Sequence, residues 1–484
     1  MDSQFFPEAQ IMKRLALDNP WWDGSGILRE YEEMKPRLFL RPFLSLLESL
    51  PRGRSIIMLG ARRVGKTVLI HHSISRLIEN GIDPRKIIFL TVDGALLNLN
   101  GLHLEEMLEL AAKASKTELS RETEGLYVFF DEIQYLENWE SELKVLSDTY
   151  KGIRFVASGS AAAALKFKSM ESGAGRFTHF CLPPLLFCEY LRMAGAEGLV
   201  VPTRVNWFGK LTDGFDTVNV EGLNSHFIKY LNYGGFPEAV VGGALTENPH
   251  RYVKEDMIDK VLLRDLPGLY GISDTRDLYR LFVNVVFRSG EEFSYEDLSR
   301  ASGLRKEVLK KYLTYLESAF LIKIFHKVDE SARKFQRVST FKIYVTNPSV
   351  FAAVFSPVTP DDEAFNHLVE AAIYTQLSQS DKEDLYYANW RSGRRCGEVD
   401  FVRLDILGQK PERALEVKWS DKYSRNPGEL KSLLAFMENN SLERAVVTSV
   451  TEARLARMDR ISLQFVPTAL YAYAAGIESV KTSD

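Results

Sequence analysis

The feature that most constrains the fold is a glycine-containing loop between an apolar run and a helical run. The apolar run is Ser55–Leu59 (SIIML), the loop GARRVGKT follows at Gly60–Thr67, and a helical stretch begins at Val68. Glycines allow backbone N–H groups to turn toward phosphate oxygens, and the N-terminus of the next helix adds its positive end. The pattern therefore predicts a nucleotide-binding α/β domain.

Each residue type in this loop has an expected part in binding a triphosphate. The Lys66 ammonium is expected to reach the β- and γ-phosphates, and the Thr67 hydroxyl to coordinate Mg²⁺. The alternative is a glycine-rich turn without a ligand. We predict ATP and Mg²⁺ as ligands, and expect the following residues to contact the nucleotide: Gly60, Ala61, Arg62, Arg63, Val64, Gly65, Lys66, Thr67 and Val68.

An acidic pair follows a later apolar run. Leu126–Phe130 (LYVFF) ends in Asp131 and Glu132, where buried charge is costly unless a cation is present. Asp131 is predicted to hold Mg²⁺, and Glu132 to orient and deprotonate the attacking water; the alternative is a solvated pair that begins a helix. After the next run, Ile153–Ala157, Ser160 is a candidate sensor of the γ-phosphate or a helix cap.

These apolar runs share a pattern with a further run at Lys86–Val92, and helical stretches separate them. Runs without polar alternation are typical of a parallel sheet covered by helices on both faces. The chain has 484 residues, more than one hydrophobic core usually supports, so further domains are expected. A segment rich in Gly, Asp and Asn, Gly209–Asn224, is predicted to be a loop or lid connection.

Several motifs in order resemble a prokaryotic family of AAA-type ATPases, in which an archaeal-type ATPase domain precedes a C-terminal region. The motifs lie mainly between Arg41 and Val240 and read GARRVGKT, FFDEIQYLENWE, ASGSAAAAL, GRFTHFCLPPLLFCEYL and YGGFPEAVV. The resemblance implies that Asp131 and Glu132 are the Walker B pair and that Ser160 is the sensor.

Two further positions match motifs of that family. They are Gln134 and Arg176. Arg176 is a candidate to stabilise transition-state charge, acting on a neighbouring subunit of a homo-oligomer. The alternative for Arg176 is a salt-bridged surface residue.

A basic segment lies in the middle of the chain. Residues 293–345 hold 11 Lys/Arg and 6 Asp/Glu, although the whole chain has a formal net charge of −4. A helix over Tyr295–Ala301, a turn at Gly303 and a helix over Lys306–Ser318 resemble a winged helix. Winged helices bind either DNA or protein partners. The second helix begins with basic residues, where a recognition helix would contact DNA: Arg305, Lys306, Lys310 and Lys311.

The C-terminal region carries a third set of candidate functional residues, three carboxylates and a lysine. Glu370 lies in a helical run (FNHLVEAAIYTQL), Asp400 in GEVDFV, and Glu416 and Lys418 in ALEVKW. Residues two apart on a strand share a face, so Glu416 and Lys418 should point together. The three carboxylates predict a Mg²⁺ site, with Lys418 positioning or deprotonating the nucleophile. Glu398 should face the same side as Asp400 and is a further candidate for the site, although the favoured expectation is a solvated strand-end carboxylate.

The order of these residues resembles the PD-(D/E)xK nuclease fold. The resemblance implies that Asp400, Glu416 and Lys418 are catalytic and that Glu370 joins the metal ligands. Val399 stands where this fold usually has proline.

Composition excludes some classes of protein. Cys181, Cys188 and Cys396 form no C-x-x-C pair, which excludes a disulfide framework and argues against a structural zinc site. No apolar stretch reaches the roughly 18 residues of a membrane helix, and the N-terminus lacks the pattern of a signal peptide. A cytoplasmic protein without a membrane partner is expected.

The sequence thus predicts an α/β protein in four parts. They are a P-loop AAA-type ATPase domain (1–190), a helical lid (191–290), a winged-helix-like module (291–350) and a restriction-endonuclease-like domain (351–484). The leading hypothesis is an ATP-hydrolysing protein that acts on DNA, in defence or in maintenance of mobile DNA. One alternative is a nucleotide-gated oligomeric switch or scaffold whose C-terminal domain binds a partner without cutting. Another is a DNA-binding ATPase that uses the winged helix alone.

Overall fold

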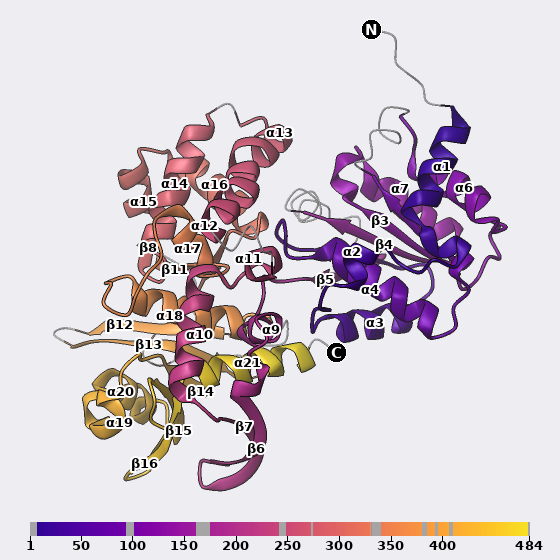
Figure 1. Cartoon of the computed structure of the whole chain (residues 1–484). Coiled ribbons are helices and arrows are strands. Elements are labelled where there is room, and N and C mark those ends of the chain that lie inside the picture. Colours follow the sequence, from indigo (N-terminus) through magenta and orange to yellow (C-terminus); the bar gives the residue numbers. More distant parts are fainter. Residues whose placement is uncertain are drawn as a thin grey trace. The chain divides into compact units, whose positions relative to one another are not determined.

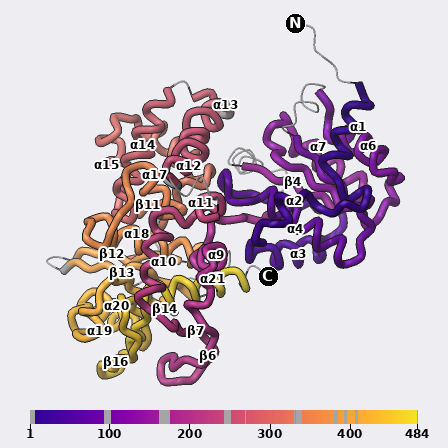
Figure 2. The backbone as a smooth tube through the Cα atoms, viewed as in Figure 1, coloured from indigo at the N-terminus to yellow at the C-terminus, as the bar shows by residue number. Residues whose placement is uncertain are grey.

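The structure is a computed structural model, and the chain divides into two compact units, one ending at Pro183 and one beginning at Pro184. Figures 1 and 2 show the course of the backbone within each unit. The described residues are 7–92, 101–160, 175–241, 248–272, 274–329, 331, 340–379, 385–392, 395–405 and 410–482. In this part of the chain, no helix combines the length and apolar character needed to cross a membrane.

The N-terminal unit is built on a five-stranded sheet in which every neighbouring pair is parallel. The order is β2-β3-β4-β1-β5, so β4 lies between β1 and β3. The predicted parallel sheet is confirmed. The strands are β1 (Ser55–Leu59), β2 (Ile87–Thr91), β3 (Tyr127–Asp131), β4 (Arg154–Gly159) and β5 (Phe177–Cys181).

Helices cover both faces of this sheet. In Figure 1, α3 and α4 lie on one face and α1, α6 and α7 on the other, and the helices within each group pack together. Fully buried strands such as β1 and β3 require this double cover. The helices are α1 (Glu8–Asp18), η1 (Pro20–Asp23), α2 (Arg29–Glu32), α3 (Leu40–Ser49), α4 (Lys66–Glu79), η2 (Pro84–Lys86), α6 (Leu104–Ser115), η3 (Ile133–Tyr135) and α7 (Trp139–Thr149).

The C-terminal unit contains a seven-stranded mixed sheet in the order β10-β12-β13-β14-β15-β17-β16. β13 is antiparallel to β12 and β14, whereas β14 is parallel to β15. The strands are β10 (Lys327–Val328), β12 (Leu385–Ser392), β13 (Arg395–Leu404), β14 (Pro411–Glu416), β15 (Arg444–Ser449), β16 (Arg454–Met458) and β17 (Ile461–Pro467).

Helices pack on this mixed sheet and build its core. α20 contacts β13, its Phe436 stacks on Trp390 of β12 with ring centroids 6.1 Å apart, and α18 packs along α21. The apolar side chains of β13, β15 and α20 form one buried cluster. The helices are α18 (Phe365–Leu377), α19 (Lys422–Arg425), η9 (Pro427–Glu429), α20 (Lys431–Asn439) and α21 (Thr468–Thr482).

A smaller sheet in the same unit has the order β8-β11-β9 and accompanies α14, α15 and α16. The predicted order of helix, turn, helix and strand is confirmed, with the Ser294 hydroxyl accepting the Asp297 N–H at 3.0 Å and Gly303 in the left-handed region. The elements are α14 (Thr275–Phe287), β8 (Glu292–Ser294), α15 (Tyr295–Ser302), α16 (Lys306–Ser318), β9 (Ile322–Phe325) and β11 (Thr340–Val345). Residues 330 and 332–339 of the predicted basic segment lie outside the described residues.

One continuous stretch of chain joins the two sheets. β9 belongs to the three-stranded sheet, and β10, which begins two residues later, pairs with β12 of the seven-stranded sheet. Phe325 at the junction packs against Tyr374 and Phe401, with ring centroids 4.9 and 5.7 Å apart. The segment predicted as a winged-helix module therefore packs directly on the α/β part.

The predicted loop at Gly209–Asn224 is wrong. These residues form β7 (Lys210–Thr217) of an antiparallel hairpin with β6 (Val200–Trp207), and then the start of α10 (Val220–Tyr233). Gly209 lies in the hairpin turn, and Asn219 caps α10. The other segments of this unit are α9 (Phe187–Met193), η5 (Glu197–Leu199), α11 (Pro237–Val241), α12 (Pro249–Tyr252), η7 (Val253–Asp259), η8 (Val261–Asp265), α13 (Leu266–Tyr270) and α17 (Ser349–Val354).

Candidate functional site

The predicted phosphate loop connects the C-terminal end of β1 to α4. A Cβ atom at Gly60 would lie 2.4 Å from the Leu182 carbonyl oxygen, so only glycine fits after the strand. Gly65, immediately before α4, has φ +92° in the left-handed region that glycine adopts without strain. The backbone thus requires glycine at both positions, in agreement with the phosphate-loop pattern.

Lys66 is buried within this loop. Its ammonium donates to the carbonyl oxygens of Gly60 and Ala61 at 3.1 and 3.0 Å. Burial lowers the pKa of Lys66, whereas the carboxylates of Glu132 and Asp131 act in the opposite direction. A phosphate oxygen would offer this buried cation a charged acceptor, so the loop fits a triphosphate.

The acidic pair ends β3 beside the loop. The Thr67 hydroxyl donates to one Asp131 oxygen at 2.7 Å, and the Ser158 hydroxyl at the end of β4 donates to the other. Burial, and then the nearby Glu132 carboxylate, raise the pKa of Asp131. A hydroxyl and a buried carboxylate in contact are ligand types that suit Mg²⁺.

Gln134 connects Glu132 to the end of β4. Its amide nitrogen donates to the Glu132 carboxylate, and its amide oxygen accepts the backbone N–H of Ser160 at 3.1 Å. Glu132 itself has φ +56°, in the left-handed region that non-glycine residues rarely adopt. Ser158 of β4 is hydrogen-bonded to Asp131, and the predicted sensor role of Ser160, which directly follows β4, stays a prediction.

The structure does not bring Arg176 to the phosphate loop of its own chain. Arg176 precedes β5, and its carbonyl accepts the N–H of Ser55, the first residue of β1. Arg176 therefore lies at the N-terminal ends of the strands, whereas the loop lies at their C-terminal ends. There its guanidinium pairs with Asp148 at 2.8 Å. A role for Arg176 on a neighbouring subunit stays a prediction.

A different arginine braces the loop, and the sequence pattern did not indicate it. Arg37 is buried and donates to the carbonyls of Val64 and Pro183 at 2.5 and 2.9 Å. It lies outside the loop motif, 27 residues before Val64, so only the folded chain reveals this contact.

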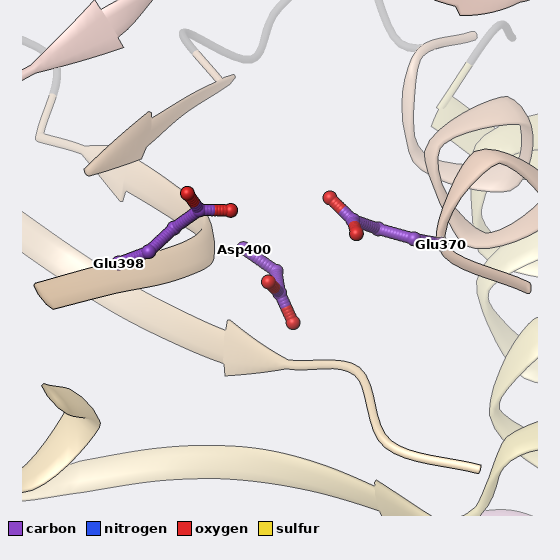
Figure 3. A group of neighbouring side chains, drawn as sticks. All are labelled: Glu370, Glu398 and Asp400. Atoms are coloured by element: carbon purple, nitrogen blue, oxygen red, sulfur yellow. The ribbon is translucent and has the colours of Figure 1, made fainter. Parts of the chain in front are cut away.

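A second candidate site lies in the C-terminal unit. Glu370 of α18 and Glu398 and Asp400 of β13 each offer a carboxylate oxygen, and the three oxygens lie within 4.8 Å of one another. Figure 3 shows the Glu370 and Glu398 carboxylates extending toward one another from the helix and the strand, with the Asp400 side chain between them. This trio includes two of the predicted metal ligands, and Glu398 in place of the predicted Glu416.

Glu416 and Lys418 adjoin the trio at the end of β14. The Lys418 ammonium lies 2.7 Å from Glu416 Oε1 and 3.7 Å from Asp400 Oδ2. Glu416 is 6% exposed, and its Oε2 has no hydrogen-bond partner among the described residues. Burial, and then Asp400, raise the pKa of Glu416 to about 8. A buried, unpartnered carboxylate oxygen beside Asp400 fits a hard cation such as Mg²⁺.

Two residues of β11 also reach this site, and the sequence pattern did not indicate either. The Lys342 ammonium lies 2.8 Å from Glu370 Oε1 and 2.6 Å from Glu398 Oε1, and the Tyr344 hydroxyl donates to Glu370. Glu398 was expected to be a solvated carboxylate. Its side chain is 40% exposed, yet it is held by Lys342 and by the Asn389 amide at 2.9 Å.

The predicted basic helix is α16, and its lysines have local partners. Lys306 donates to Glu296, and Lys310 lies 5.0 Å from the Tyr295 ring centroid. Lys311 lies 5.8 Å from the Tyr315 ring centroid. The contacts order these side chains on one helix, and DNA binding by α16 stays a prediction.

Comparisons with known proteins agree with the first site. A family model described as an AAA domain matches residues 52–191, and one described as a domain of unknown function, DUF8612, matches residues 224–361. Residues 52–191 therefore form an AAA-type P-loop domain. In Methanocaldococcus jannaschii, uncharacterized protein MJ1637 is 24% identical over 81% of this chain and 80% of its own length. An uncharacterized protein of Haemophilus influenzae is 20% identical over 79% of this chain and 86% of its own.

Solved structures give weaker similarities. The S. cerevisiae Hsp104:casein complex aligns with 60% of this chain and 52% of that chain, at 13% identity and a TM-score of 0.28. AMPPCP-bound DnaA from Aquifex aeolicus aligns with 57% of this chain and 85% of that chain, at 14% identity and a TM-score of 0.27. Scores this low do not establish a shared overall fold.

Proposed function

We propose that the N-terminal unit binds ATP with Mg²⁺ and hydrolyses it to ADP and phosphate. The observation that carries the proposal is the 2.7 Å hydrogen bond between the Thr67 hydroxyl and the Asp131 carboxylate. It brings together, at the end of the phosphate loop, the two oxygen ligands that P-loop enzymes use for Mg²⁺. When bound, Mg²⁺ would offset the negative charge of the phosphates.

The residues of the chain have separate parts in this reaction. Lys66 exchanges its two carbonyl acceptors for phosphate oxygens when the nucleotide binds. Glu132, oriented by the Gln134 amide, accepts a proton from the water that attacks the γ-phosphorus, while the bond to the ADP oxygen breaks. Arg176 of a neighbouring copy supplies positive charge to that transition state, so the active form is a homo-oligomer.

Binding of fluorescent ATP and release of phosphate test this proposal. Lys66→Ala should remove both signals, because the loop loses its only lysine. Arg176→Ala should lose phosphate release and keep binding. Mixing Arg176→Ala with Glu132→Gln chains should restore part of the activity if the two residues act in different copies. A wild-type protein that binds no ATP in magnesium buffer would end the proposal.

We further propose a Mg²⁺-dependent DNA nuclease site in the C-terminal unit, which would serve defence against mobile DNA or its maintenance. Its support is that Asp400 and Glu416 both pair with the Lys418 ammonium, and that a Glu370 carboxylate oxygen lies within 4.8 Å of one of Asp400. The helix that carries Glu370 precedes the strand that carries Asp400 and the strand that ends in Glu416, as in the PD-(D/E)xK fold. α16 would supply contacts to DNA phosphates.

The chemistry would follow from the charges of these groups. Asp400 and Glu416 would hold Mg²⁺, which activates water and stabilises the leaving oxygen. Lys418, 27% exposed, would position the attacking water and stabilise the charge that develops on the phosphate. Val417, between Glu416 and Lys418 in the sequence, donates its N–H to Asp400 Oδ2 at 2.7 Å. This hydrogen bond fixes the Asp400 carboxylate against the end of β14.

Incubation with linear and circular DNA, Mg²⁺ and ATP tests the nuclease. Asp400→Ala should abolish cleavage, whereas Glu429→Ala, which removes an exposed carboxylate paired with Lys422, should leave it intact. If wild type and Asp400→Ala behave alike, the nuclease proposal fails. ATP-dependent oligomerisation without cleavage, with Glu416→Ala fully functional, would favour the switch or scaffold, in which this fold binds a partner.

A further inference from the structure

Lys342 is a buried cation that comes from outside the mixed sheet. It lies on β11, the central strand of the three-stranded sheet, and only 3% of its side chain is exposed. Its ammonium lies 5.3 Å from the Tyr387 ring centroid. A lysine so thoroughly removed from water is costly unless carboxylates pair with it. Its position therefore depends on the acidic groups around it.

Those groups are the carboxylates that would otherwise attract a metal ion. The ammonium lies 2.8 Å from Glu370 Oε1 and 2.6 Å from Glu398 Oε1, two of the three residues whose oxygens come within 4.8 Å of one another. Mg²⁺ lies about 2.1 Å from its oxygen ligands. A metal bound to the same two oxygens would thus stand at most about 4.7 Å from the Lys342 nitrogen, where two cations repel.

Metal binding is favoured on the side of Glu416, where the Lys418 ammonium takes up only one of the two Glu416 oxygens, at 2.7 Å. Glu416 keeps one buried oxygen without a partner among the described residues, and Asp400 lies beside it. Counted as ionised, the four carboxylates and two lysines carry a net charge of −2: Glu370, Glu398, Asp400, Glu416, Lys342 and Lys418. One divalent ion balances that charge, and a second would not be balanced.

We propose that Lys342 is the fixed cation of this site, standing between Glu370 and Glu398 in the place of a second metal ion. The site then takes one divalent ion, held by Asp400 and Glu416. This inference rests on the metal site proposed above. Lys342 acts as a positioning residue, since it orients Glu370 and Glu398, and it makes the three-stranded sheet an integral part of the site.

Counting bound Mn²⁺ on the nucleotide-free full-length protein tests this assignment. Wild type should bind one ion at this site, and Lys342→Met should bind one more. Lys342→Arg should behave as wild type, because the positive charge is kept. Lys327→Met is a matched control, because it removes a lysine that pairs with Glu292 at 2.9 Å within the same module. It should leave the number of bound ions unchanged.

Carboxylate variants give a test that does not depend on the folding of Lys342→Met. Asp400→Asn should abolish Mn²⁺ binding at this site, whereas Glu398→Gln should keep the single ion. Adding Glu398→Gln to Lys342→Met should remove the extra ion. Loss of the ion in Glu398→Gln alone would overturn the inference, because it would make Glu398 a metal ligand.

The outcomes separate this inference from the proposed metal site. If Lys342→Met binds as many ions as wild type, with equal affinity, or loses Mn²⁺ altogether, the fixed-cation assignment fails and the metal site stands. If neither wild type nor Lys342→Met binds an ion that Asp400→Asn removes, the metal site fails, and the inference fails with it.

Discussion

Replacing Glu416 by glutamine should change how the stability of the C-terminal unit depends on pH. The folded state raises the pKa of Glu416 from 4.5 to about 8. Between these values the folded chain holds a proton that the unfolded chain has released, so Glu416 makes the protein less stable as pH rises. A glutamine side chain cannot ionise, so the variant should lack this slope.

The structure sets the size of the effect. One pKa unit corresponds to about 1.4 kcal/mol, so the loss of stability in wild type between pH 5 and pH 8 is at most about 4 kcal/mol. Lys418 stays beside Asp400 in the variant, 3.7 Å away. Glu416→Gln should therefore resemble wild type near pH 5 and become more stable than wild type by a few kcal/mol at pH 8.

Thermal unfolding of the full-length protein at both pH values measures this difference. The relevant transition is the one that ADP does not shift, because a nucleotide bound to the other unit stabilises that unit. Glu429→Gln, on an exposed carboxylate paired with Lys422 at 2.6 Å, is the control and should change stability by under about 1 kcal/mol at either pH. A stability difference between Glu416→Gln and wild type that is equal at pH 5 and pH 8 would refute the reasoning.

Three further predictions concern the other proposed contacts. Glu132→Gln should bind ATP as wild type does and release phosphate at least about 100-fold more slowly, and unchanged turnover would remove Glu132 as the base. Gly60→Ala should destabilise the N-terminal unit by about 1–3 kcal/mol in thermal unfolding, because its Cβ meets the Leu182 carbonyl at 2.4 Å, whereas Gly198→Ala meets no atom within 4 Å and should be neutral. Charge reversal of Lys310 and Lys311 should weaken DNA binding. The slope of the logarithm of the binding constant against the logarithm of the salt concentration should fall by about one for each lost phosphate contact. Fluorescence anisotropy curves identical to those of wild type would exclude α16 as a DNA-binding helix.

The fold was most predictable where burial leaves a continuous signal in the sequence. The run Ser55–Leu59 coincides with β1, because every residue in it is buried. β5 was not predicted, since this edge strand exposes Cys181 and has no continuous apolar run. Gly209–Asn224 was predicted as a loop because Gly, Asp and Asn favour turns, yet one hairpin turn and one helix cap account for Gly209 and Asn219.

The candidate sites were predictable where one motif or one strand fixes the geometry. Thr67 and Asp131 meet because parallel strands bring the loop and the acidic pair to the same sheet edge. Lys342 could not be predicted as part of the carboxylate site, because it reaches Glu370 of α18 and Glu398 of β13 only where the three-stranded sheet packs on them. Arg37 is similar, since nothing in its local sequence indicates a contact with the loop.

The unbroken passage from β9 into β10 has a mechanical consequence. A single residue, His326, separates the last residue of one sheet from the first residue of the next, and Phe325 is clamped between aromatic rings at that point. A hinge needs a flexible linker of several residues, and His326 alone lies between these two strands. A displacement of α16 on ligand binding would thus be transmitted to the carboxylate site through a rigid connection rather than absorbed by a flexible linker.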